Sequence, residues 1–360
     1  MKGRGKGLLA AGAGLVLGGF VGLTGCAVLD LLMKTGMDRE EPKLLKGMET
    51  RISGARGGPA YAAALEEAMA AQEKRVTEPV EITARDGTPL AGHWAPVKEP
   101  RRAVLAVHGW RGGWTQAFGM MADFLEEQGC SVLYIDQRGT NGSGGDHIGF
   151  GLLEKLDCAD WLNWLAERCP GLPLYMMGMS MGGTSVLMAA GEPLPETLRG
   201  IVADSAFTTP KAILEHVARS NLHLPFGLTA RAAEAAFRRK LGAAADSCST
   251  VDVLKRCSVP VLLIHGGKDR FVPPDMAFEN YRACAGPRRL FFVPGADHVG
   301  CWFTDETGYR RALTDLWREY DPLLPAKEGP AGPSIGSSPG VTGVLRRTGK
   351  LSLNTSAVGR

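Results

Sequence analysis

One serine in the chain lies in a setting that indicates nucleophilic chemistry. Ser180 stands in Gly178-Met179-Ser180-Met181-Gly182, after a short apolar run and before the apolar stretch Thr184–Ala190. A serine on a sharp strand-to-helix turn has a strained backbone and an exposed hydroxyl, and side chains two residues to either side would clash. The same pattern recurs around Ser334 and Ser338, but without a strand before it or a helix after it. The context therefore selects Ser180 as the nucleophile.

A serine nucleophile needs a general base, and the base needs a third group that orients it. Asp269 comes just after the apolar run Val261–Ile264, and His298 comes just after the run Leu290–Val293. Both residues would therefore lie at strand ends, downstream of Ser180 in the order Ser, Asp, His. We predict that His298 is the base and that Asp269 is the acid that orients it.

The sequence offers other acids and histidines near strand ends. Asp204 also follows a strand and is the alternative acid, whereas Asp297 adjoins His298 and would point elsewhere. His108 and His265 each precede a glycine at a strand end, where we expect them to form hydrogen bonds within loops rather than to act as bases.

Acyl transfer also requires two N–H groups that hold the developing oxyanion. Met181 follows the nucleophile and would stand at a helix N-terminus, where backbone donors and the helix dipole favour an anion. The second donor should come from the loop after Ala103–Val107, which reads His108-Gly109-Trp110-Arg111-Gly112-Gly113. The backbone N–H of Trp110 is the predicted second donor, and the alternative is that its side chain only packs over the site.

Eight short apolar runs alternate with helical stretches between about residues 76 and 320, as in a sheet flanked by helices. They are Val80–Thr83, Leu90–Ala95, Ala103–Val107, Val132–Ile135, Leu174–Met177, Gly200–Ala203, Val261–Ile264 and Leu290–Val293. The first two flank Arg85-Asp86-Gly87, a strong hairpin signal, and the others are nearly unbroken, as in parallel strands buried on both faces. We therefore expect an α/β fold with a mostly parallel, doubly wound sheet and an antiparallel N-terminal hairpin.

An insertion rich in apolar residues separates the sixth and seventh runs. It extends over about residues 205–258 and includes Phe207, Ile213 and Phe237. We expect a small helical cap over the pocket, because ligands of such sheets bind beyond the carboxyl ends of the strands.

The N-terminal region carries a segment long enough to cross a membrane. Lys2, Arg4 and Lys6 precede 22 uncharged residues, Leu8–Leu29, and about 20 apolar residues span a bilayer core. Residues 1–33 are therefore expected to be an anchor, with the catalytic domain on the outer side of the cell membrane. The alternative is a lipoprotein signal cleaved before Cys26, in Leu23-Thr24-Gly25-Cys26.

Two further regions flank the expected domain at 76–321. Residues 34–75 are predicted to be a charged linker and a lead-in helix over Tyr61–Lys74. Residues 322–360 are rich in Gly, Pro and Ser without apolar periodicity, so we expect a disordered tail. Seven cysteines remain besides Cys26; we expect most to be small core residues, although Cys248 and Cys257 could close a loop.

The charge balance argues against a nucleic-acid-binding protein. The formal net charge is +3, but the basic excess lies at the two ends of the chain and the middle is acidic overall. A nucleic-acid binder needs its basic residues on the folded domain. We expect no nucleic-acid partner.

Residues about 76–320 resemble an α/β-hydrolase fold serine hydrolase. The resemblance rests on the His108-Gly109-Trp110 loop, on Asp136-Gln137-Arg138-Gly139 with Gly142-Ser143-Gly144, on the elbow, and on the late Asp and His. It implies acyl transfer to water with no metal and no cofactor, and a structural role for the 136–139 loop. With its apolar N-terminal segment, the chain is similar to membrane-anchored bacterial hydrolases described as esterases or peptidase-like enzymes.

The predicted function is hydrolysis of a small-molecule ester with a small to medium acyl group. A cap of about fifty residues can shelter a compact apolar group, and a pocket of a few hundred Å³ is typical of such sites. A serine aminopeptidase or another amidase would use the same three residues. A non-catalytic surface protein on a hydrolase scaffold is the alternative of a different class.

Overall fold

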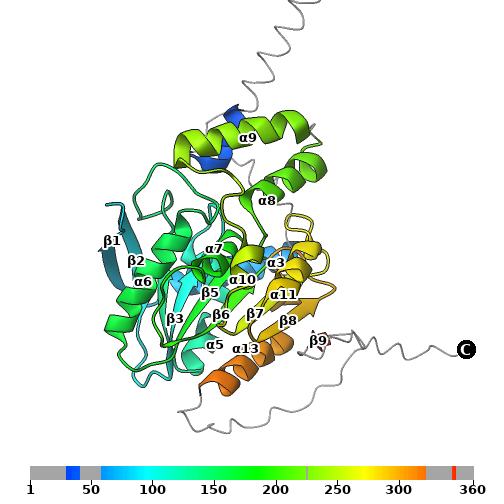
Figure 1. Ribbon diagram of the computed structural model, residues 1–360. Helices are drawn as coiled ribbons and strands as arrows, with labels where there is room; N and C mark the ends of the chain where they lie inside the picture. Colours follow the sequence, from blue (N-terminus) through cyan, green and yellow to red (C-terminus); the bar gives the residue numbers. More distant parts are fainter. Residues whose placement is uncertain (1–29, 41–57, 224–225, 322–342, 346–360) are drawn as a thin grey trace, which may run out of the picture.

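The computed structural model describes residues 30–40, 58–223, 226–321 and 343–345. Nine strands of this part of the chain form one sheet in the order β1-β2-β4-β3-β5-β6-β7-β8-β9 (Figure 1). Their bounds are β1 Glu78–Thr83, β2 Pro89–Ala95, β3 Arg102–Val107, β4 Cys130–Ile135, β5 Leu174–Met179, β6 Leu198–Asp204, β7 Val261–Gly266, β8 Arg288–Val293 and β9 Gly343–Leu345. Strands β3 to β8 run parallel, and β1, β2 and β9 pair with their neighbours antiparallel.

Helices cover both faces of this sheet. One face packs against α6 (Glu154–Arg168), α7 (Met181–Ala189), α10 (Thr250–Leu254) and α11 (Pro274–Ala283). The other packs against α4 (Trp114–Phe118), the short turn η2 (Gly119–Met121), α5 (Ala122–Glu127), α12 (Cys301–Thr304) and α13 (Glu306–Tyr320). Strand β3 shows why: Leu105 and Val107 belong to one apolar cluster, and Val104 and Ala106 belong to the other. A strand buried on both faces is expected to be apolar, and after Arg102 the sequence of β3, Ala103–Val107, contains only apolar residues.

The expected α/β architecture is confirmed. Each of the eight apolar runs lies within one of the strands β1 to β8, and β1 and β2 form the predicted hairpin, with Ile82 paired to Leu90. Gly87 in its turn has φ +86°, a conformation that favours glycine. The main difference lies at the strand ends, since β5 extends to Met179 and β6 to Asp204.

Helices α8 (Pro210–His216) and α9 (Phe226–Leu241), with the π-helical turn η3 (Val217–Asn221) between them, lie above the sheet in Figure 1. They form the cap over the strand ends, since their residues line a cavity that reaches Ser180. Helix α10, which also falls within the predicted cap stretch, packs instead against α7 and α11 beside the sheet. The cap proper therefore ends before residue 250.

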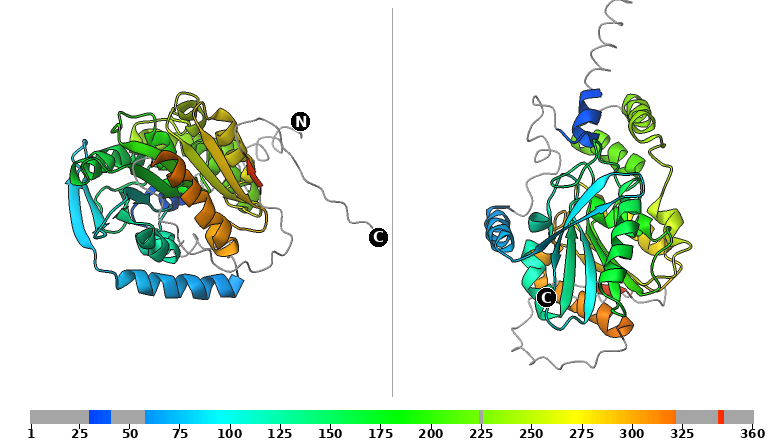
Figure 2. Two further views of the ribbon diagram at one scale, coloured as in Figure 1. Left: turned by 90° about the horizontal axis from the view of Figure 1, so that it is seen from below. Right: turned by 90° about the vertical axis from the view of Figure 1, so that its left-hand side faces the viewer.

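The described parts of the predicted anchor and linker pack onto the domain. Residues 30–37 form a helix beside the cap (Figure 2, right). The predicted lead-in helix is α3 (Gly58–Glu73), which packs against α4 and η2. Residues 34–40 of the predicted charged linker contact the domain, as described below, and residues 41–57 lie outside the described residues.

The two ends of the chain are described only in part. The apolar stretch 8–29 lies outside the described residues, and none of the helices that the structure does describe is both long and apolar enough to cross a bilayer. Three residues of the predicted disordered tail, Gly343–Leu345, form β9 against β8, which the composition did not predict.

The seven described cysteines are free thiols, and all except Cys248 are buried. The expectation of small core residues is therefore confirmed for most of them. The loop closure considered for Cys248 and Cys257 is not formed.

Candidate active site

Ser180 occupies the turn between β5 and α7, with φ 55° and ψ −118°. This positive φ is strained for a residue with a side chain. A Cβ at Gly178 would lie 2.2 Å from the carbonyl oxygen of Gly182, and a Cβ at Gly182 would lie 2.1 Å from the carbonyl oxygen of Val107. Only glycine fits at either position, so the sequence pattern is a direct consequence of the turn.

The structure brings the three predicted catalytic residues together. The distance from His298 Nε2 to Ser180 Oγ is 2.9 Å, and the distance from His298 Nδ1 to Asp269 Oδ2 is 2.7 Å. All three side chains are buried. They come from the ends of β5, β7 and β8, so the parallel sheet aligns residues that are up to 118 positions apart in sequence.

The Asp269 carboxylate is fixed by its own loop. Its Oδ1 accepts hydrogen bonds from the backbone N–H groups of Phe271 at 2.9 Å and Val272 at 2.8 Å, which leaves Oδ2 for His298. Burial raises the pKa of Asp269, but the adjacent His298 and His265 outweigh it and hold this pKa well below its ordinary value. The acid is therefore ionised at neutral pH and able to stabilise a charged imidazole.

His265 lies beside the same carboxylate, a contact that the sequence analysis did not predict. Its Nε2 is 2.9 Å from the carbonyl oxygen of Val272 and 3.3 Å from Asp269 Oδ2. It does not reach Ser180 in any hydrogen bond of the described residues, so its position agrees with the predicted role within a loop. The signal that could have found it is its place at the end of β7, four residues before Asp269.

Asp204, the alternative acid, is occupied by other groups. Its Oδ1 accepts a hydrogen bond from Ser205 Oγ at 2.9 Å, and its Oδ2 accepts one from Tyr309 Oη at 3.2 Å. Ser205 Oγ in turn accepts a hydrogen bond from the backbone N–H of Val299, the residue after His298. Burial raises the pKa of Asp204 to about 6. Asp204 thus braces the loop that carries His298, and the geometry favours Asp269 as the acid.

The two predicted oxyanion donors lie around Ser180. Met181 is the first residue of α7. Trp110 lines two cavities, described below, that both reach Ser180. No hydrogen bond from either backbone N–H to another described residue is found. The Trp110 side chain also packs over the site, with Nε1 donating to the carbonyl oxygen of Gly36 at 2.8 Å.

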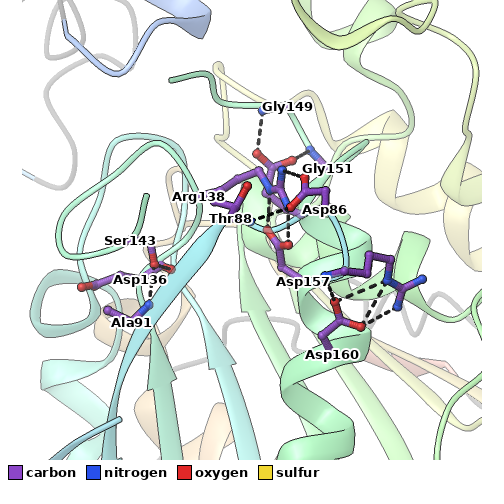
Figure 3. A network of polar contacts seen from close by, with 12 residues as sticks. Asp86, Thr88, Ala91, Asp136, Arg138, Ser143, Gly149, Gly151, Asp157 and Asp160 are labelled. Carbon is purple, nitrogen blue, oxygen red and sulfur yellow. Dashed lines mark hydrogen bonds and ion pairs between the residues drawn. The ribbon is translucent and has the colours of Figure 1, made fainter. Parts of the chain in front are cut away.

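The loop after β4 lies at the same edge of the sheet as Ser180 and makes the structural contacts expected of it. Figure 3 shows Arg138 paired with Asp157 and Asp86, with contacts of 2.5 and 2.8 Å. In the same loop, the backbone N–H of Gln137 donates to His108 Nε2 at 3.1 Å. Burial lowers the pKa of His108. This buried ring is therefore neutral and serves to hold the loop of residues 108–113.

Two cavities meet at Ser180, and Trp110 and Phe271 line both. The larger one, of about 670 Å³, is bounded by the cap, by residues 32–36 and by apolar side chains that include Phe150 and Phe207. The smaller one, of about 580 Å³, is bounded by α3, by η2 and by Val299 and Trp302. Both volumes fall in the range of small-molecule binding sites. No cluster of three or more metal-ligating side chains occurs among the described residues.

Comparisons with known proteins agree with this architecture. A sequence model of the alpha/beta hydrolase fold matches residues 102–248. The uncharacterized protein YfhR of Escherichia coli (strain K12) is 27% identical over 249 residues, which cover 66% of this chain and 80% of that protein. Protein bem46 of Schizosaccharomyces pombe is 24% identical over 257 residues, which cover 69% and 79% of the two chains.

Solved structures show the same fold. The esterase Pf2001 of Pyrococcus furiosus superposes with a TM-score of 0.54 at 22% identity, covering 68% of this chain and 93% of that one. The alpha/beta hydrolase GrgF from Penicillium sp. sh18 superposes with a TM-score of 0.55 at 18% identity, covering 69% and 100%. Together with the strand order and the elbow, these matches show that the chain has the α/β-hydrolase fold.

Proposed function

We propose that this protein is a serine hydrolase that cleaves carboxylic esters with small to medium acyl groups. The observation that carries the proposal is the chain of hydrogen bonds from Ser180 through His298 to Asp269 at the meeting point of two cavities. The distance of 2.9 Å between His298 Nε2 and Ser180 Oγ lies within the range that proton transfer to a general base requires.

The first half of the reaction forms an acyl-enzyme. His298 Nε2 takes the hydroxyl proton as Ser180 Oγ bonds to the ester carbonyl carbon, and Asp269 stabilises the resulting imidazolium. The backbone N–H groups of Met181 and Trp110 would hold the oxyanion. When this intermediate collapses, the bond from carbon to the leaving oxygen breaks and His298 gives its proton to the departing alcohol.

The second half releases the acid. Water donates a proton to His298 as its oxygen bonds to the acyl carbon, and collapse of the second intermediate breaks the bond to Ser180 Oγ, which regains the proton from His298. The protons balance over the cycle, and no step needs a metal or a cofactor.

The two cavities suggest which side of the ester each one takes. The leaving oxygen must receive a proton from His298, and the smaller cavity is the one that includes Val299, next to His298. We therefore place the alcohol in the smaller cavity and the acyl group in the larger, mostly apolar one. An alkyl chain is transferred favourably from water to such a lining, at about 0.8 kcal/mol per buried methylene.

A substrate panel on the full chain tests the proposal. We expect aryl esters to give the highest kcat/KM, with an optimum at a small or medium acyl length, because an alcohol leaves more easily than an amine. The highest kcat/KM on aminoacyl anilides would favour an aminopeptidase or amidase. A kcat/KM that rises steadily beyond about twelve carbons would contradict the small-to-medium preference.

We also propose that the catalytic domain is held at the outer face of the cell membrane. The support is the uncharged stretch 8–29 after Lys2, Arg4 and Lys6. Protease treatment of intact cells should digest the domain, and protection until lysis would contradict this orientation. Lipid labelling of the wild-type protein that is lost in Cys26→Ala would show instead that the protein is a lipoprotein acylated on Cys26.

A further inference from the structure

Residues 30–40 lie between the cap and the active-site loops. Their helix runs beside α9 (Figures 1 and 2), and the ion pair of Asp30 with Arg239 at 3.1 Å joins the two helices. Met33, Thr35 and Met37 are buried. The segment is therefore packed into the domain, although its charges are those of a linker.

One side of this segment faces the larger cavity. Leu32, Met33, Thr35 and Gly36 line that cavity together with Ser180. Met33 and Met37 belong to the same apolar cluster as Met181, Phe150 and Phe207. The cavity that we assign to the acyl group would therefore lack part of its wall without these residues.

The backbone carbonyls of the segment hold the loop that carries Trp110. Arg111 donates from Nε and Nη2 to the carbonyl oxygen of Thr35, at 3.0 and 2.7 Å, and from Nη1 to that of Arg39 at 3.2 Å. It also donates to the carbonyl oxygen of Asp38. Trp110 Nε1 donates to the carbonyl oxygen of Gly36 at 2.8 Å. Arg111 has φ 48°, a strained value for a non-glycine residue, so the loop needs such contacts to keep this conformation.

The far end of the segment is attached to a second loop. The backbone N–H of Arg39 donates to the carbonyl oxygen of Asp146 at 2.8 Å, and Arg39 Nη2 donates to that of Asn141 at 2.8 Å. The backbone N–H of Ile148 donates to the carbonyl oxygen of Met37 at 2.6 Å. Contacts along the whole segment therefore fix its carbonyls relative to the sheet.

We propose that residues 30–40 complete the active site, as a wall of the acyl cavity and as the support that positions the loop of residues 108–113 through Arg111. The inference rests on the proposed function, because it assigns an acyl cavity and an oxyanion donor. It makes Met33 a residue that determines acyl length, and it makes Arg111 a positioning residue that acts through the backbone of Trp110.

The wall is tested by Met33→Trp in the full chain, assayed with aryl esters of graded acyl length. A larger side chain in the cavity should cut kcat/KM for octanoyl and longer esters by about 10-fold or more, while the acetyl ester changes by less than about 3-fold. Met33→Leu preserves the volume and should keep the wild-type profile. An unchanged dependence of kcat/KM on acyl length in Met33→Trp, or an equal loss of kcat/KM at every acyl length, would overturn the proposal that Met33 forms a wall of the acyl cavity.

The support is tested by Arg111→Ala. Loss of one oxyanion donor costs about 10²–10³-fold in kcat, so a displaced loop should lower kcat by about 10–100-fold with little change in KM. Arg111→Lys should not restore kcat, because the single nitrogen of an ammonium lacks the planar fork that places three separate nitrogens against the carbonyls of Thr35, Asp38 and Arg39. Arg318→Ala removes an exposed arginine on α13 and is the control.

Fold and function are separated by two further measurements. Thermal unfolding of Arg111→Ala shows whether the protein is folded at the assay temperature, and the rate of labelling by a fluorophosphonate reports on the site without turnover. Wild-type kcat in folded Arg111→Ala, or a loss of kcat that only matches a loss of folded protein, would overturn the positioning role. A wild-type protein that neither hydrolyses esters nor becomes labelled would instead overturn the proposed function itself.

Discussion

Replacement of Asp269 by asparagine is expected to disable the base without disturbing the loop that holds it. The side-chain oxygen of the asparagine can still accept the hydrogen bonds from the N–H groups of Phe271 and Val272, which Asp269 Oδ1 accepts at 2.9 and 2.8 Å. The amide NH₂ then takes the place of Oδ2, 2.7 Å from His298 Nδ1. Because an amide nitrogen donates and cannot accept, His298 must be protonated on Nε2 instead of Nδ1.

That tautomer cannot take the proton of Ser180. The loss in kcat should be about 10⁴-fold, as for removal of the acid from a serine triad, which corresponds to about 5 kcal/mol of transition-state stabilisation. KM should change little, because Asp269 lines neither cavity.

The assay is hydrolysis of a short aryl ester by Asp269→Asn, with Asp204→Asn as the matched control. Asp204 contacts Ser205 and Tyr309 rather than His298, so the control should lose less than about 10-fold. A larger loss in Asp204→Asn than in Asp269→Asn would refute the reasoning and assign the acid to the end of β6.

Three further predictions concern the framework. Gly182→Ala should abolish activity and lower the free energy of unfolding by about 1–3 kcal/mol, because its Cβ would meet the Val107 carbonyl; Gly227→Ala, with open space around it, should be near neutral in chemical denaturation. Asp321→Ala leaves Arg102 buried without its carboxylate partner, at 2.7 Å in the wild type, and should cost about 3–5 kcal/mol in urea unfolding with kcat unchanged. Burial raises the pKa of Asp204 to about 6, from an ordinary value of 3.8. The folded state therefore holds this proton more tightly than the unfolded chain does, and the stability it provides is lost as the pH rises from about 4 through 6. Relative to Asp204→Asn, the wild type should lose on the order of 3 kcal/mol over that interval, and an equal pH dependence of the two proteins would contradict this.

The sheet and the elbow could be predicted because local sequence determines them. Strands buried on both faces must be apolar throughout, and the turn at Ser180 excludes any Cβ at Gly178 and Gly182. The choice between Asp204 and Asp269 could not be made as firmly, since both follow strands. It depends on which groups bind each carboxylate: backbone N–H groups orient Asp269, whereas the hydroxyls of Ser205 and Tyr309 bind Asp204. These contacts are not visible in a local pattern.

The role of residues 30–40 could not be predicted for a related reason. Lys34, Asp38 and Arg39 are charged, and charge in a short segment is typical of a solvent-exposed linker. The partners that bind this segment lie about seventy to two hundred residues away, on the Trp110 loop and on α9. The interactions are mostly with its backbone carbonyls, which every sequence possesses.

Covalent labelling with a fluorophosphonate probe tests the central claim most directly. The full chain should gain one adduct, and peptide mass spectrometry should place it on Ser180. Ser180→Ala should remove both the labelling and at least about 10⁴-fold of the ester hydrolysis while the fold stays intact. Labelling at Ser334 or Ser338, or undiminished hydrolysis by Ser180→Ala, would contradict the assignment of Ser180 as the nucleophile.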